Sequence, residues 1–103
     1  MINMACINLT DDEIQAAVNV LQSGALVMGK ENAAFEEAYA AKTGAAHAVS
    51  SSSGTAALML AYMTFLEPGD EVIVPAWTFI ATASTVAFCG GTPVFCDVDP
   101  ESF

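Results

Sequence analysis

The apolar positions at the start of the chain repeat with the period of a helix. They recur at intervals of three and four residues, the spacing that lines one face of a helix: Ile14, Val18 and Leu21. Thr10 and Glu13 have the spacing of a capping box, in which each residue accepts a hydrogen bond from the other's backbone. The sequence therefore predicts a first helix over residues 10–23.

A second helix is predicted over residues 30–43. Phe35 and Tyr39 are four residues apart and would share one face of it. Gly44 suits its C-terminal end, because glycine adopts the left-handed conformation that closes many helices.

From residue 46 onward, short apolar segments alternate with helical ones. Strands are predicted over 46–50, 71–74 and 93–98, and helices over 55–66 and 78–89. Strands separated by helices of this length pair in parallel through right-handed crossovers. The fold class is therefore α/β, with a β-α-β-α-β unit over 46–98, and we expect a single partial domain over 1–103.

Composition and charge narrow the possible partners. Hydrophobic residues make up 54% of only 103 residues, which favours a homo-oligomer or a piece of a larger protein. The net charge is −10, with Lys30 and Lys42 as the only basic residues, so nucleic acid is excluded as a partner. An anionic membrane surface is disfavoured for the same reason.

Other classes of site and location have little support in the sequence. The three cysteines show no Cys-x-x-Cys spacing and His47 is the only histidine, so we expect no metal site and a reducing, cytoplasmic location. The uncharged run over 72–96 is long enough for a membrane span, but prolines and glycines interrupt it, and buried parallel strands explain it better. The N-terminus lacks the pattern of a signal peptide.

A serine-rich turn follows the first predicted strand. Four serines lead into Gly54 and Thr55, where a helix without breakers begins. The first backbone N–H groups of a helix have no internal partner, and Gly54 would let a ligand approach closely. This pattern predicts a phosphate-binding site. The same residues also fit a serine-rich loop that only caps a core helix.

The loop after the second predicted strand contains Trp77 and Phe79. Ligands of parallel sheets bind beyond the carboxyl ends of the strands, so this loop and the serine-rich turn should share one edge. An aromatic side chain there can stack on a flat ring, although either one could instead fill the core. Together they suggest a phosphorylated planar cofactor.

These segments resemble the N-terminal part of the DegT/DnrJ/EryC1/StrS family of pyridoxal-phosphate-dependent sugar aminotransferases. The matching segments are Gly29 with Phe35-Glu36, Ser52 to Leu58, Pro68 to Pro75, Thr78 to Ala83, and Gly91 to Phe95 with Asp97. Their order and spacing are specific and cover nearly the whole chain.

The resemblance implies the aspartate-aminotransferase-like (type I) fold, a three-layer α/β/α large domain with a mostly parallel sheet that works as a homodimer. It implies that backbone amides at Gly54, Thr55 and Ala56, beside Ser53, bind the phosphate of pyridoxal 5'-phosphate. Phe79 would stack on the pyridine ring, with Trp77 in the same pocket. Met28 and Gly29 would border the substrate site.

The resemblance also implies that two residues needed for catalysis are absent from this chain. The Schiff-base lysine and the aspartate that pairs with the pyridine nitrogen lie downstream in the family, and Lys30 and Lys42 match neither motif. We therefore expect an incomplete cofactor site, no catalytic residue, and no activity from this chain alone. The implied reaction transfers an amino group from an amino-acid donor to a nucleotide-linked keto-sugar.

Three alternatives remain open at this stage. One is a sugar dehydratase of the same family, and another is a non-catalytic α/β oligomerisation module. The third is a different phosphate-binding α/β protein.

Overall fold

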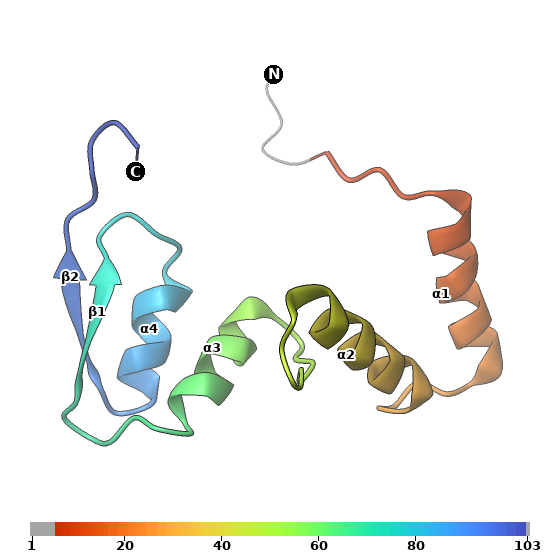
Figure 1. Ribbon diagram of the computed structural model, residues 1–103, viewed down its shortest axis with the longest axis horizontal. Helices are drawn as coiled ribbons and strands as arrows, with labels where there is room; N and C mark the ends of the chain where they lie inside the picture. Colours follow the sequence, from red (N-terminus) through yellow and green to blue (C-terminus); the bar gives the residue numbers. More distant parts are fainter. Residues whose placement is uncertain (1–5, 103) are drawn as a thin grey trace. The chain divides into compact units, whose positions relative to one another are not determined.

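The computed structural model describes residues 6–102, which form two compact units. The boundary between the units lies between Ala48 and Val49. The sequence, by contrast, predicted a single partial domain over residues 1–103. Figure 1 shows the ribbon of the chain, coloured from the N-terminus to the C-terminus.

The first unit begins with helix α1 (Asp11–Ser23), and the predicted capping box is present. The backbone N–H of Thr10 donates to Glu13 Oε2 at 2.6 Å, and the N–H of Glu13 donates to Thr10 Oγ1 at 3.4 Å. Gly24 ends the helix with φ at 71°, in the left-handed region. Four residues of sequence thus determine where this helix starts.

Helix α2 (Lys30–Thr43) follows and ends, as predicted, at Gly44 with φ at 74°. The rings of Phe35 and Tyr39 lie on one face with their centroids 6.0 Å apart. Neither α1 nor α2 has a buried residue. Of the apolar side chains that predicted these helices, Val18 is half-buried, whereas Ile14, Leu21, Phe35 and Tyr39 are exposed within the described residues.

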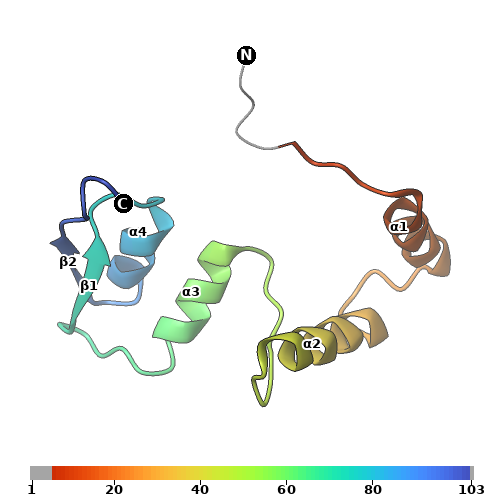
Figure 2. The same cartoon turned by 45° about the horizontal axis from the view of Figure 1, so that its top comes forward.

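The second unit has the order α3 (Gly54–Tyr62), β1 (Glu71–Pro75), α4 (Ala81–Phe88) and β2 (Thr92–Cys96). The two strands pair in parallel, and Ile73 is the register partner of Val94. Figure 2 shows them side by side, with α4 along one face. Helix α3 packs against α4 on the side away from the sheet. The parallel β-α-β crossover predicted from the sequence is thus present.

The core of this unit lies between the sheet and α4. Val74 from β1 packs with Ala83 and Val86 from α4, and Val74 and Val86 are almost completely buried. Thr85 is also fully buried, and its hydroxyl donates to the carbonyl of Ala81 at 2.7 Å, which satisfies the polar group. This packing places the N-terminal end of α4 near the carboxyl end of β1.

The prediction of a strand over residues 46–50 is not met, because this segment has no strand structure. A strand is held by hydrogen bonds to a neighbour. Among the described residues the sheet contains only β1 and β2. The strand pairing that the predicted strand needs is therefore not provided by residues 6–102.

The other elements are shorter than predicted. Helix α3 ends at Tyr62 instead of residue 66, because the amides of Thr64 and Phe65 donate to the carbonyls three residues before them, Ala61 and Tyr62, in the manner of turns. Helix α4 begins at Ala81 instead of residue 78, although Ile80 already has helical angles. Strand β2 ends at Cys96 instead of residue 98.

Candidate functional site

The N-terminus of α3 presents hydrogen-bond donors that have no acceptor among residues 6–102. The Ser53 hydroxyl accepts the backbone N–H of Ala56 at 3.1 Å and so caps the helix. Within residues 6–102, the N–H groups of Gly54 and Thr55 and the Thr55 hydroxyl have no protein acceptor. The Ser53 hydroxyl keeps its own proton for a further acceptor. Four donors are therefore available.

These donors line a pocket of about 730 Å³ in the second unit. Its walls come from the first turns of α3 and α4: Ser53, Gly54, Thr55, Ala57, Leu58, Phe79, Ala81 and Thr82. Both helices thus begin at the pocket, with the positive ends of their dipoles directed at it. That arrangement favours an anion.

The chemistry of the pocket is neutral. None of its lining residues has an ionisable side chain, so any attraction for an anion comes from amides, hydroxyls and helix dipoles. Gly54 leaves room for close approach, because a Cβ built there would meet no protein atom within 4 Å. This donor set and this space fit a phosphate ester beside an aromatic ring.

The predicted site residues separate into two groups. Ser53, Gly54, Thr55 and Phe79 line the pocket together, and the Phe79 side chain is 74% exposed. Ala56 and Trp77 do not line it.

The Ala56 amide is already bonded to Ser53, so it is not a free donor. Trp77 is 69% exposed in the loop before Phe79.

The sequence did not point to Thr82, which also lines the pocket. The signal was its position three residues after Phe79, since residues three apart share one face of a helix. The serines before Ser53 were expected to add donors. None of them lines the pocket, and the Ser51 hydroxyl instead donates to the Ser53 carbonyl at 3.0 Å.

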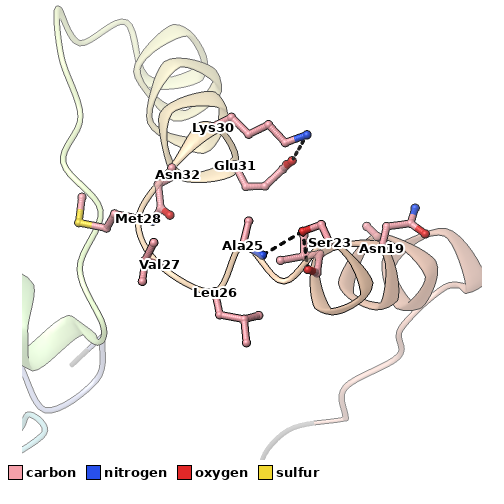
Figure 3. A pocket seen from close by; sticks show the side chains of 12 residues that line it. Asn19, Ser23, Ala25, Leu26, Val27, Met28, Lys30, Glu31 and Asn32 are labelled. Atoms are coloured by element: carbon pink, nitrogen blue, oxygen red, sulfur yellow. Dashed lines mark hydrogen bonds and ion pairs between the residues drawn. The ribbon is translucent and has the colours of Figure 1, made fainter.

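Met28 and Gly29 lie in the first unit and line a separate pocket of about 630 Å³. It is formed by the last turns of α1, the connecting loop and the first turn of α2 (Figure 3). The Ser23 hydroxyl accepts the Ala25 N–H at 3.2 Å, which fixes the start of that loop. Lys30 pairs with Glu31 at 3.7 Å on the rim, and both side chains are largely exposed.

No three histidine, cysteine or acidic side chains in residues 6–102 come together as a metal site. Within the same range, the helices are too short or too polar to cross a bilayer.

Comparison with known proteins assigns the family. The model of the DegT/DnrJ/EryC1/StrS aminotransferase family matches residues 8–103. The chain belongs to this family. A relative from Acidithiobacillus ferrooxidans, UDP-N-acetyl-3-dehydro-alpha-D-glucosamine 3-aminotransferase, is 46% identical over 96 residues, which are 92% of this chain and 26% of the relative.

Two solved structures of relatives share the fold. A DegT/DnrJ/EryC1/StrS aminotransferase from Brucella abortus is 41% identical with a TM-score of 0.81, over 87% of this chain and 24% of that one. GDP-4-keto-6-deoxy-D-mannose-3-dehydratase from E. coli, solved with hydrated PLP, is 35% identical with a TM-score of 0.83. That match covers 96% of this chain and 28% of the dehydratase.

These likenesses confirm the predicted fold class, the N-terminal part of the type I aminotransferase fold. The chain spans about a quarter of the length of the relatives that it matches.

Proposed function

We propose that this chain provides the part of a pyridoxal-phosphate-dependent aminotransferase that binds the cofactor's phosphate and faces its ring. The observation that supports this most directly is the pocket where Ser53, Gly54 and Thr55 meet Phe79. The substrate proposed for the whole enzyme is a nucleotide-linked keto-sugar, with an amino acid as donor. The Acidithiobacillus relative, named for a UDP-linked sugar, supports that substrate class.

Each residue has a distinct task in this proposal. The amides of Gly54 and Thr55 donate to the phosphate, and the hydroxyls of Ser53 and Thr55 add two donors. Phe79 offers its exposed ring to one face of the pyridine. Ala56 contributes indirectly, because its N–H orients the Ser53 hydroxyl. The cofactor, when bound, supplies an electron sink for amino-group transfer.

We further propose that the chain does not transaminate by itself. Amino-group transfer on this cofactor needs a lysine amine beside the ring. The only lysines in the sequence, Lys30 and Lys42, lie on the exposed surface of α2 in the first unit, and neither lines the pocket. Binding of the cofactor to this chain is then non-covalent and weak.

A dehydratase of the same family is the second candidate. The likeness to the E. coli dehydratase, at 35% identity over 96% of the chain, supports it. Both candidates use the same phosphate site, so the pocket of this chain favours neither of them. The family's usual determinant is whether a lysine or a histidine occupies a downstream position, and the nucleotide sequence after the codon for Phe103 would distinguish them.

We also infer that the chain self-associates, as expected for a homodimeric family, and that it works in the cytoplasm. One face of the β1–β2 sheet is uncovered within the second unit, and Ile73 on that face is 76% exposed. Exposed apolar faces of this kind favour association. Light scattering at micromolar concentration should detect species larger than the monomer, and a monodisperse monomer would contradict this inference.

The test of the phosphate site is a titration followed by tryptophan fluorescence. Trp77 is the only tryptophan and lies two residues from Phe79, so it reports on ligands at this loop. Pyridoxal 5'-phosphate should quench it at concentrations where pyridoxal, which lacks the phosphate, does not. Equal quenching by the two compounds would refute the phosphate assignment.

A pair of variants tests the aromatic contact. Phe79→Ala should weaken binding about two- to tenfold, the range expected for one aromatic stacking contact. Phe88→Ala is the matched control, because Phe88 is similarly exposed at 73% but does not line the pocket. Equal losses in both variants would show that ring removal acts through the fold and not through the site.

A further inference from the structure

Two threonine hydroxyls join the loop before α4 to the first turn of that helix. Thr78 Oγ1 lies 2.9 Å from Thr82 Oγ1, a hydrogen bond in which either hydroxyl can donate. Phe79 lies between these two residues in sequence. The hydroxyl pair therefore closes a short loop of chain around the residue whose ring faces the pocket.

Few other contacts fix the position of the Phe79 side chain. Its side chain is largely exposed, and among residues 6–102 no ring contact involves it. Its carbonyl accepts the Thr82 N–H at 3.0 Å, and the Ile80 carbonyl accepts the N–H groups of Ala83 and Ser84, which joins the turn to α4. The orientation of the ring is thus set mainly by the conformation of the turn.

We propose that the Thr78–Thr82 hydroxyl pair is a positioning device that fixes this turn and so holds the Phe79 ring against the pocket. The inference rests on the proposed function for its ligand but makes a separate claim about the ligand-free chain. Thr82 lines the pocket whereas Thr78 does not, so the two residues can be tested apart. If Thr82 acted only by touching the ligand, removal of the Thr78 hydroxyl would not affect ligand binding.

The ligand-free arm measures backbone order by ¹⁵N relaxation. Thr82→Val keeps the shape of the side chain and removes the hydroxyl. It should lower the amide order parameters of Phe79 and Ile80 from about 0.85, typical of rigid backbone, toward 0.6. Thr82→Ser restores a hydroxyl and should restore the order.

Thr85→Val is the matched control on the same helix. The Thr85 hydroxyl bonds to the Ala81 carbonyl in the core, so its loss should leave the Phe79 turn unchanged. A Phe79 order parameter that stays unchanged in Thr82→Val would overturn the positioning role.

The ligand arm repeats the pyridoxal-phosphate titration. Thr78→Val and Thr82→Val should each weaken binding by about two- to tenfold, the range that one net hydrogen bond spans. The double variant should be no weaker than either single one, because both remove the same bond. If only Thr82→Val weakens binding, then Thr82 contacts the ligand itself and the proposal is wrong.

The two arms separate the two claims. If the unaltered chain does not bind pyridoxal phosphate, the proposed function fails, and the proposed role of the pair in ligand binding fails with it. The relaxation arm would still report whether the pair holds the turn. A mobile turn in both valine variants with unchanged affinity would overturn the inference while leaving the phosphate site intact.

Discussion

Replacing Gly54 by alanine should separate what the fold needs from what the ligand needs. Gly54 is the first residue of α3, and its φ is outside the left-handed region that requires glycine. A Cβ at this position would meet no protein atom within 4 Å. Nothing in the packing of the protein therefore accounts for a glycine here, whereas a ligand at the helix N-terminus would.

The two expected effects have opposite signs. A glycine-to-alanine change at a compatible position stabilises by about 0.4–1 kcal/mol, because it restricts the unfolded chain. That corresponds to a melting temperature about 2–8 °C higher in a domain of this size. The new methyl group would also stand where phosphate approaches the amides of Gly54 and Thr55. Loss of one charged hydrogen bond weakens binding about ten- to hundredfold.

Thermal unfolding followed by circular dichroism without ligand, and the Trp77 titration with pyridoxal phosphate, measure the two effects separately. Gly91→Ala is the control, because a Cβ there would lie 2.8 Å from Leu66 Cδ2 and 3.0 Å from Val86 Cγ1. That variant should be destabilised by about 1–3 kcal/mol through overpacking. A stable Gly54→Ala variant with unchanged affinity would refute the reasoning about the pocket.

Three other properties should respond to defined changes. The Thr10 backbone N–H and hydroxyl hold the pKa of Glu13 below its ordinary value of 4.5, so the capping box stabilises α1 fully above pH 4.5. Circular dichroism should show helix loss as the pH falls through the lower pKa of the folded state, a step that Glu13→Gln removes because glutamine does not titrate. Val86→Ala should cost about 1–3 kcal/mol in urea unfolding, because Val86 is completely buried against Val74. Binding of pyridoxal phosphate should strengthen between about pH 5 and 7, since a phosphate ester loses its second proton near pH 6, and a flat profile would contradict this.

The helix ends were predictable because their causes are local. The capping box at Thr10 and Glu13 needs four residues, and Gly44 closes α2 through its own backbone angle. The rule for parallel sheets led the sequence to place the serine-rich turn and the Phe79 loop at one edge, and both contribute residues to one pocket although no strand precedes Ser53 in the described part of the chain.

Two details of the site depend on geometry that spacing does not determine. The side-chain rotamer of Ser53 determines which amide donates to its hydroxyl, and in the structure this donor is the Ala56 N–H. The sequence had counted that amide among the phosphate donors. The pairing of Thr78 with Thr82 likewise depends on how the chain turns after Pro75. In both cases a small polar side chain had several partners within reach.

The strand expected over residues 46–50 failed for a different reason, and the reason bears on function. A helix satisfies its own backbone groups, whereas a strand depends on a neighbour that can lie far away in sequence. The donors of the pocket belong to the first turn of α3, which forms in the structure although residues 46–50 do not form a strand. In the proposed function, phosphate binding therefore depends on the α3–α4 packing and not on a strand over residues 46–50. It follows that variants within 46–49 should leave the ligand affinity of this chain unchanged, while variants that loosen α4 should lower it.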